Sequence, residues 1–277
     1  MENSVIVEPG KIQSGFGRKV KNHASFAQTT RDSLTMAYRG LLKLKRKPDQ
    51  FIDVLIFPII STLMFTYMFG GAIAGNVASY LPYIIPAIIL QTVLQASVTT
   101  GVQLRDDMDK GVFDRFKSLP IARIAPLAGA LIADIVRYVV ALVIIIATSL
   151  IMGFRPEGGP LMVIFAMLFV MFCAWGLSWI FAFFGVIAKS STAVQGISMM
   201  VMMPLTFLSN AFVPTKTLPD WLRWFADVNP MSHMISAVRD LINESMVSAD
   251  FWWSLLGIAV IIAIFAPLAL RAYMRKA

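Results

Sequence analysis

Few residues of this chain have the types and spacing that catalysis requires. The phosphate-binding pattern GxxxxGK[ST] is absent, because the one Gly-Lys pair, Gly10-Lys11, is followed by Ile12. The metalloprotease pattern HExxH and the hydrolase pattern GxSxG are absent as well. Ser178 lies near Gly176 in an apolar stretch, where a serine more often packs than reacts. We therefore expect no catalytic residue, no metal site and no cofactor in this chain, so any ATP chemistry would come from another chain.

Ionisable residues inside apolar stretches are the remaining candidates for chemistry, since a charge in a membrane is costly. Asp53 stands at the start of one such stretch, where it can meet lipid headgroups or nearby cations. Asp134 and Arg137 are three residues apart, so one helix face can hold them as an ion pair. We expect this pair to be structural rather than a proton relay, because a proton-coupled carrier usually needs an acid that titrates alone.

The composition predicts an integral membrane protein of the all-α class. The chain has 277 residues, of which 57% are hydrophobic and 14% charged, and its mean hydropathy is +0.72. Soluble domains carry about 25% charged residues. Crossing a bilayer takes about 20 apolar residues, and six stretches supply them: 51–70, 81–102, 124–152, 161–188, 193–213 and 251–270. We predict a multi-pass protein with six transmembrane helices, in the cell membrane and by expectation the bacterial cytoplasmic membrane.

The basic residues predict the orientation of these helices. With six crossings, the side that carries both termini holds 19 of the 24 Lys and Arg residues, and the opposite side holds 4. Because cytoplasmic loops collect Lys and Arg, both termini are expected in the cytoplasm. The net charge of +8 therefore indicates membrane topology rather than a nucleic-acid partner.

The segments outside the apolar stretches differ in character. Residues 1–24 lack periodicity and are expected to form a flexible cytosolic tail. Residues 25–47 form a basic amphipathic pattern that predicts a helix lying in the membrane surface against lipid headgroups. Residues 214–250 contain a Trp-rich turn followed by Asn229-Pro230, which predicts two re-entrant or interfacial helices on the outer side.

The charged segment between the second and third apolar stretches predicts a docking element. Over 107–119, apolar residues recur at helical spacing on a charged helix, and Pro120 ends the pattern. The helix could lie in the headgroups or against its own bundle, but its exposed Phe residues favour docking into a cytosolic partner protein. The expected contact residues are Met108, Val112, Phe113, Arg115, Phe116, Lys117 and Leu119.

Two rows of side chains on the fourth and fifth stretches could line a route for a bulky apolar solute. Met is flexible and polarizable and suits promiscuous binding surfaces, but both rows could equally face lipid or neighbouring helices. The candidate residues are Phe169, Phe172, Trp175 and Trp179 in the aromatic row, and Met199, Met200, Met202 and Met203 in the Met row.

Several short motifs resemble one family in their order and spacing. They are RKP at 46–48, GVFDRFKSLPIAR at 111–123, GFRP at 153–156, LSNAFVP at 208–214, LPDWL at 218–222, NPMS at 229–232, and Arg239. Together they resemble permease subunits of type-2 ABC exporters, in the daunorubicin-resistance-like branch that also serves antibiotic and lipid export. Phe113 and Phe116 stand where members of this family usually have Leu.

The resemblance implies a fold, partners and a role. It implies that 25–277 is a type-2 transmembrane domain, with a connecting helix at 25–47 and a coupling helix at 107–119. It also implies a second permease chain, the same or related, and two copies of a cytosolic ABC ATPase that bind ATP and Mg²⁺. The chain itself would be no enzyme, and would move a hydrophobic or amphipathic drug, antibiotic or lipid-like compound outward. The alternatives are an ion-coupled secondary carrier of hydrophobic compounds and a non-transporting membrane scaffold.

Overall fold

The computed structural model describes residues 26–45, 48–112, 124–213, 215 and 219–276, and these residues form only helices and their connections. The elements are α1 (Phe26–Lys45), α2 (Pro48–Ala74), α3 (Val77–Asp109), α5 (Ala125–Ile151), α6 (Gly159–Ile187), α7 (Ser191–Phe207), α8 (Asp220–Val228), α9 (Pro230–Arg239), the π-helix η2 (Asp240–Glu244) and α10 (Ala249–Lys276). The predicted all-α class is confirmed.

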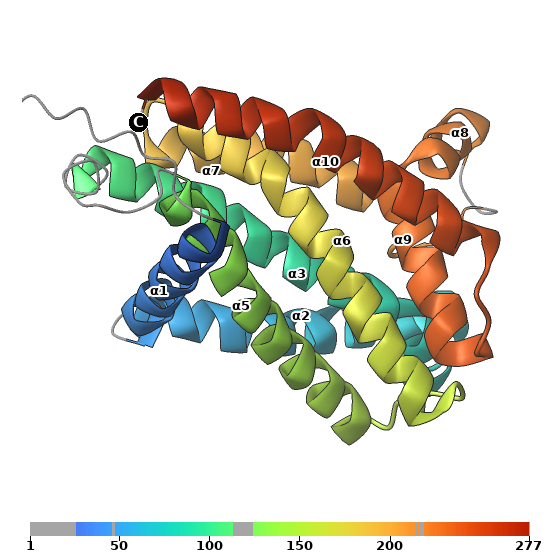
Figure 1. The fold of residues 1–277 in the computed structure, drawn as a ribbon. Helices are drawn as coiled ribbons and strands as arrows, with labels where there is room; N and C mark the ends of the chain where they lie inside the picture. Colours follow the sequence, from blue (N-terminus) through green and yellow to red (C-terminus); the bar gives the residue numbers. More distant parts are fainter. Residues whose placement is uncertain (1–25, 46–47, 113–123, 214, 216–218, 277) are drawn as a thin grey trace, which may run out of the picture.

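The central element is α3, which packs against α2, α5, α6, α7 and α9 (Figure 1). Its fully buried side chains include Ile84, Ile88 and Leu94. The helix begins where the Asn76 side chain accepts a hydrogen bond from the Ser79 amide at 2.8 Å. Around it, α6 lies along α10, and α1 lies against α5. The long apolar stretches become helices because a helix satisfies every backbone group without water.

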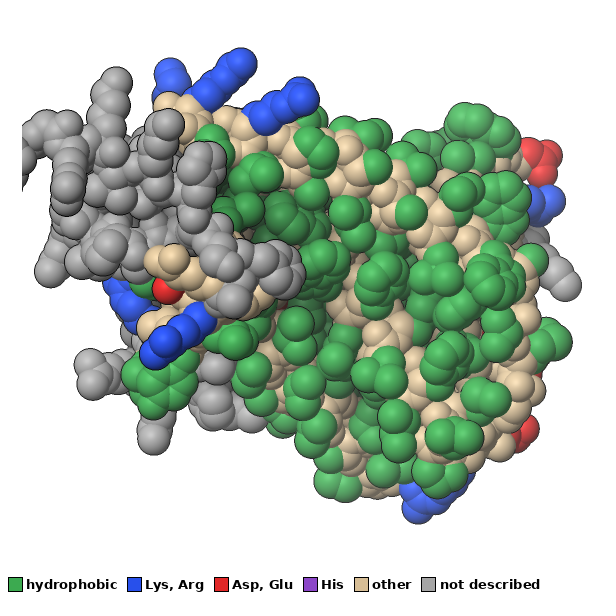
Figure 2. Space-filling view, in the orientation of Figure 1, with side chains coloured by type: hydrophobic (Ala, Val, Ile, Leu, Met, Phe, Trp, Pro, Cys, Tyr) green, Lys and Arg blue, Asp and Glu red, His purple; other side chains and the backbone are tan. Residues whose placement is uncertain are grey.

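The surface is as apolar as the sequence predicts. Four helices of the described chain are long and apolar enough to cross a membrane, namely α3, α5, α6 and α10. The apolar helices over Pro58–Ala74 and Ser191–Phe207 are shorter. Hydrophobic side chains cover most of the visible face, and most visible Lys and Arg side chains lie at the end that holds α1 and the C-terminus (Figure 2). The protein is therefore a multi-pass membrane protein, while the six crossings and their orientation stay predictions.

The fifth apolar stretch ends earlier than predicted. Its helix, α7, ends at Phe207, whereas the sequence predicted a span over 193–213. The six residues that follow leave the helix because their carbonyls find other donors. The Tyr80 hydroxyl donates to the carbonyl of Phe212 at 2.8 Å, and the Tyr83 hydroxyl donates to that of Asn210 at 2.7 Å. Hydrogen bonds from two tyrosines of α3 thus take the place of backbone hydrogen bonds in the last turns of the predicted span.

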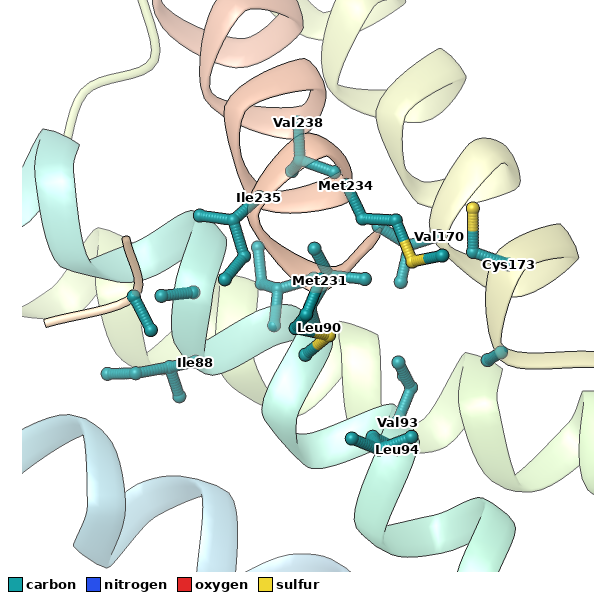
Figure 3. Close-up of a cluster of buried hydrophobic side chains, with 14 of the residues drawn as sticks. Ile88, Leu90, Val93, Leu94, Val170, Cys173, Met231, Met234, Ile235 and Val238 are labelled. Carbon is teal, nitrogen blue, oxygen red and sulfur yellow. The ribbon is translucent and has the colours of Figure 1, made fainter. Parts of the chain in front are cut away.

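Helices α8 and α9 differ in environment, although the sequence predicted both to be re-entrant or interfacial helices on the outer side. On α8, Trp221 and Trp224 are 73% and 67% exposed, which suits an interfacial helix. In contrast, α9 is a core helix. Its side chains Met231, Met234 and Ile235 are buried against α3 and α6 (Figure 3). The reason is its apolar row at three- and four-residue spacing, which the structure covers completely.

Helices α3 and α6 approach each other at a pair of glycines. A Cβ atom on Gly101 would lie 2.9 Å from the carbonyl carbon of Phe181, and one on Gly185 would lie 2.5 Å from the Gly101 oxygen. Small residues that allow backbones to approach are the usual means of helix packing in membranes. The crossing therefore depends on these two glycines.

We predict that Gly101→Ala destabilises the bundle by about 1–3 kcal/mol, because backbone atoms of α6 cannot move aside as a flexible side chain would. The matched control is Gly196→Ala in α7, where an added Cβ meets nothing within 4 Å. The control should be neutral or stabilise by up to about 1 kcal/mol. Thermal unfolding of both purified variants in detergent measures the difference, and equal midpoints would contradict the proposed role of the crossing.

Candidate functional site

The segment predicted to dock a partner starts as a continuation of α3. This helix runs through Asp109, so Met108 belongs to it rather than to a separate rod beginning at 107. The helix ends there because Gly111 adopts φ 64°, a left-handed conformation that breaks helical continuity. Val112 follows this turn and is half-buried. The other predicted contact residues, Phe113, Arg115, Phe116, Lys117 and Leu119, lie outside the described residues.

Helix α1 packs against α5, the helix that follows this segment. Its Ser33, Met36 and Ala37 pack so closely on Gly129 of α5 that a Cβ there would lie 2.9 Å from the Ser33 oxygen. A second row of α1, Leu34, Tyr38 and Leu42, is exposed. The predicted amphipathic helix therefore has two faces: Ser33, Met36 and Ala37 face the protein, and the exposed apolar row is one that lipid can cover.

The ion pair predicted from the spacing is present on α5, deep in the bundle. Asp134 and Arg137 contact each other, and the side chains are 0% and 5% exposed. Thr100 of α3 completes the group: its hydroxyl donates to the second carboxylate oxygen of Asp134 and accepts a hydrogen bond from Arg137 Nη2 at 3.1 Å. Thr100 was missed by the sequence reasoning, because no local pattern relates it to a residue on another helix.

A second polar contact lies one helical turn further along both helices. The hydroxyls of Ser97 and Tyr138 are 2.7 Å apart, and both side chains are buried. Each hydroxyl also approaches the carbonyl of Ala174 on α6, at 3.3 Å from Ser97 and 3.4 Å from Tyr138. Together with the ion pair, these contacts connect α3, α5 and α6 inside an otherwise apolar interior.

The aromatic row lies on α6 and the Met row on α7, and Phe169 and Met202 belong to one buried cluster. Phe169 packs against Phe251 of α10 in a tilted arrangement with ring centroids 4.7 Å apart, and Trp175 packs edge-on against Trp179 at 5.9 Å. The aromatic row therefore serves mainly to pack α6 on its neighbour, with Phe172 left exposed. In the Met row, Met202 is buried, whereas Met199, Met200 and Met203 are exposed on α7.

The end of the bundle opposite α1 holds a polar network that includes residues of two of the short motifs (Figure 1). Arg239 donates to the carbonyls of Tyr83 at 3.1 Å and Asn210 at 3.3 Å, and its guanidinium lies 4.0 Å from the Tyr83 ring centre. The Asn210 amide donates to Ser236 at 2.8 Å. Residues from the LSNAFVP motif, from α9 and from the start of α3 therefore form one unit.

Asn229 joins this unit to α7. Its side chain accepts from the Met231 amide at 2.9 Å, which caps α9. It also donates to the carbonyls of Leu205 at 3.0 Å and Leu208 at 2.9 Å, two groups that the end of α7 leaves without helical partners. One buried amide thus satisfies two helix ends.

His233 and Cys173 are further titratable side chains in the described part of the chain. No cluster of three or more His, Cys, Asp or Glu is found there. His233 pairs with Asp250, Nδ1 to Oδ1 at 2.6 Å, and thereby connects α9 to the start of α10. Cys173 is a buried free thiol in the core.

We predict that Asn229→Ala lowers the free energy of unfolding by about 2–3 kcal/mol, since it removes a cap and leaves two buried carbonyls without donors. The control is Asn76→Ala, which removes only the exposed cap of α3 and should cost about 1 kcal/mol. Denaturant unfolding in mixed micelles compares the two. Losses of the same size would show that the bonds to α7 contribute nothing.

Comparison with known proteins gives one family. The model of the family described as "ABC-2 type transporter" matches residues 32–243. A daunorubicin resistance ABC transporter permease protein, DrrB1 of Streptomyces coeruleorubidus, is 43% identical over 88% of this chain and 86% of its own length. A Mycobacterium tuberculosis protein named "Probable doxorubicin resistance ABC transporter permease protein DrrC" is 22% identical over 63% of each chain. With its apolar helices and these relatives, the chain belongs to the ABC-2 type transporter family of membrane permeases.

Proposed function

We propose that this chain is the permease subunit of an ATP-driven exporter that moves a hydrophobic or amphipathic compound out of the cytoplasm or the inner leaflet. The observation that carries the proposal is the similarity over nearly the whole chain to a permease named for daunorubicin resistance. Because the sequence has no phosphate-binding loop, ATP and Mg²⁺ would bind to a separate ATPase subunit. Two copies of that ATPase and a second permease chain would complete the complex.

The proposed topology has six crossings with both termini in the cytoplasm. In this topology, α2 and α7 cross together with the four longer apolar helices, and α8 lies at the outer surface. The 110–124 segment then faces the cytoplasm, at the same end as α1 and the C-terminus. The excess of Lys and Arg on that side supports this orientation.

The coupling mechanism follows from the position of that segment. It connects α3, the most central helix, directly to α5. Closure of two ATPase subunits on ATP would push on Phe113 and Phe116, and the push would reach the bundle through two helices at once. A second permease chain facing α7 would enclose the exposed Met199, Met200 and Met203, which we propose as contacts for an apolar solute.

Secondary transport is less well supported by the geometry. Asp134 is the buried acid such a carrier would need, but it is bound to both Arg137 and Thr100. Proton coupling would require this pair to separate in every cycle, at a high cost in an apolar interior.

The direct test is transport by proteoliposomes that contain this chain, with and without its co-purified ATPase, using daunorubicin as the probe. We expect uptake into inside-out vesicles that requires ATP and the ATPase and is insensitive to an ionophore. Uptake that survives without the ATPase and collapses with an ionophore would instead establish a secondary carrier. The absence of an associated ATPase and of any solute movement would favour a scaffold.

We predict that Phe116→Ala weakens binding of the ATPase about 30-fold, since truncating an interface anchor commonly costs about 2 kcal/mol. Export should fall with it. The control is Ile151→Ala, which truncates an exposed side chain at the opposite end of α5 and should leave binding unchanged. Titration of the labelled ATPase against each variant in nanodiscs measures the affinity, and unaltered binding to the Phe116 variant would refute the docking role.

A further inference from the structure

The hydrogen bonds of Thr100 connect the two helices that flank the 110–124 segment. Thr100 lies nine residues before the end of α3 at Asp109, and Asp134 lies nine residues after the start of α5 at Ala125. At 1.5 Å per residue, both positions are about 14 Å from the ends of the segment. The contact therefore joins the two arms of a helical hairpin, α3 and α5, at the same distance from the segment that connects them.

The surroundings make this contact difficult to replace. Thr100, Asp134 and Arg137 are all buried, so water cannot take over a hydrogen bond that breaks. The Nη1 atom of Arg137 is already buried without a hydrogen-bond partner in the described part of the chain. A further loss would leave a second charged group unsatisfied, which is strongly unfavourable. Helices α3 and α5 are therefore joined at Thr100, and separating them there costs a large free energy.

Between this contact and the segment, the two arms touch through apolar side chains. Leu104 of α3 belongs to the same buried cluster as Leu127 and Leu131 of α5. Apolar contacts are non-directional and allow helices to slide, whereas a charge-assisted hydrogen bond specifies one register. At the level of Thr100, the close approach of Gly101 and Gly185 joins α3 to α6.

We infer that Thr100 is a positioning residue that locks the register of α3 against α5, so that a displacement of the 110–124 segment moves both helices as one body. The Asp134–Arg137 pair supplies the charged groups that make the lock strong. This inference rests on the proposed function, since it concerns how a push from an ATPase reaches the bundle. A purely structural role would instead affect stability alone.

The test uses substitutions that change one hydroxyl group. Thr100→Val keeps the shape and leaves Asp134 and Arg137 on their own helix, but removes the hydrogen bonds from Thr100 to α5, while the Ser97–Tyr138 contact stays. Thr100→Ser restores the hydroxyl. The matched control is Thr92→Val, because Thr92 is a buried threonine of the same helix whose hydroxyl has no partner in the described part of the chain.

The measurement is the number of probe molecules exported per ATP hydrolysed by the complete complex in proteoliposomes, together with its thermal midpoint. We expect Thr100→Val to lower this ratio about tenfold, the worth of a hydrogen bond to a charged group, while ATP hydrolysis continues. Thr100→Ser and Thr92→Val should keep the wild-type ratio. An unchanged ratio in Thr100→Val would overturn the inference, and so would a lowered ratio in Thr100→Ser.

A second variant serves if Thr100→Val fails to assemble. Arg137→Lys keeps the positive charge beside Asp134 but removes the Nη2 atom that binds both Asp134 and Thr100. A wild-type ratio in this variant would count against the lock, and a lowered ratio at an unchanged midpoint would support it. Failure of the proposed function is recognised separately, because the wild-type complex would then show no ATP-dependent export at all.

Discussion

The structure depends on polar side chains that must be satisfied inside an apolar bundle. Thr100, Asp134 and Arg137 bind one another between α3 and α5, and no water is available to replace any of them. The energetic gain of such a group is small, since desolvation offsets much of the attraction. Its structural effect is large, because an alternative register would leave charges without partners. Polar groups thus select the arrangement that apolar packing alone would leave open.

A similar exchange of hydrogen-bond partners shapes the half of the bundle that holds α9. Carbonyl groups released where α7 stops at Phe207 are bound by Tyr80, Tyr83 and Asn229 instead of by a further helical turn. Helix α9 lies inside the bundle, where its side chains Met231, Met234 and Ile235 fill the core (Figure 3). Helix α9 is therefore part of the core, whereas α8 projects from the bundle (Figure 1).

The two halves meet in α3, and this position explains how a signal could cross the molecule. One end of α3 carries Tyr80 and Tyr83, and its other end leads into the 110–124 segment. Tight contact with α6 at Gly101 restrains its sliding between these ends. A helix held near one end and in its middle transmits a displacement of its other end rather than absorbing it, as the proposed coupling to a separate ATPase subunit requires.

Much of this architecture is determined by the sequence, because hydrophobic length and helical periodicity are local properties. The stretches at 124–152 and 161–188 correspond closely to α5 and α6, and the spacing of Asp134 and Arg137 was enough to predict their ion pair. The motifs were sufficient to suggest the family. Partners on different helices were decided only by the tertiary structure: Thr100 for the ion pair, Arg239 for Tyr83, and the burial of α9. The physical reason is that a hydrogen bond between distant residues leaves no periodic trace in either segment, so it exists only once the helices have packed.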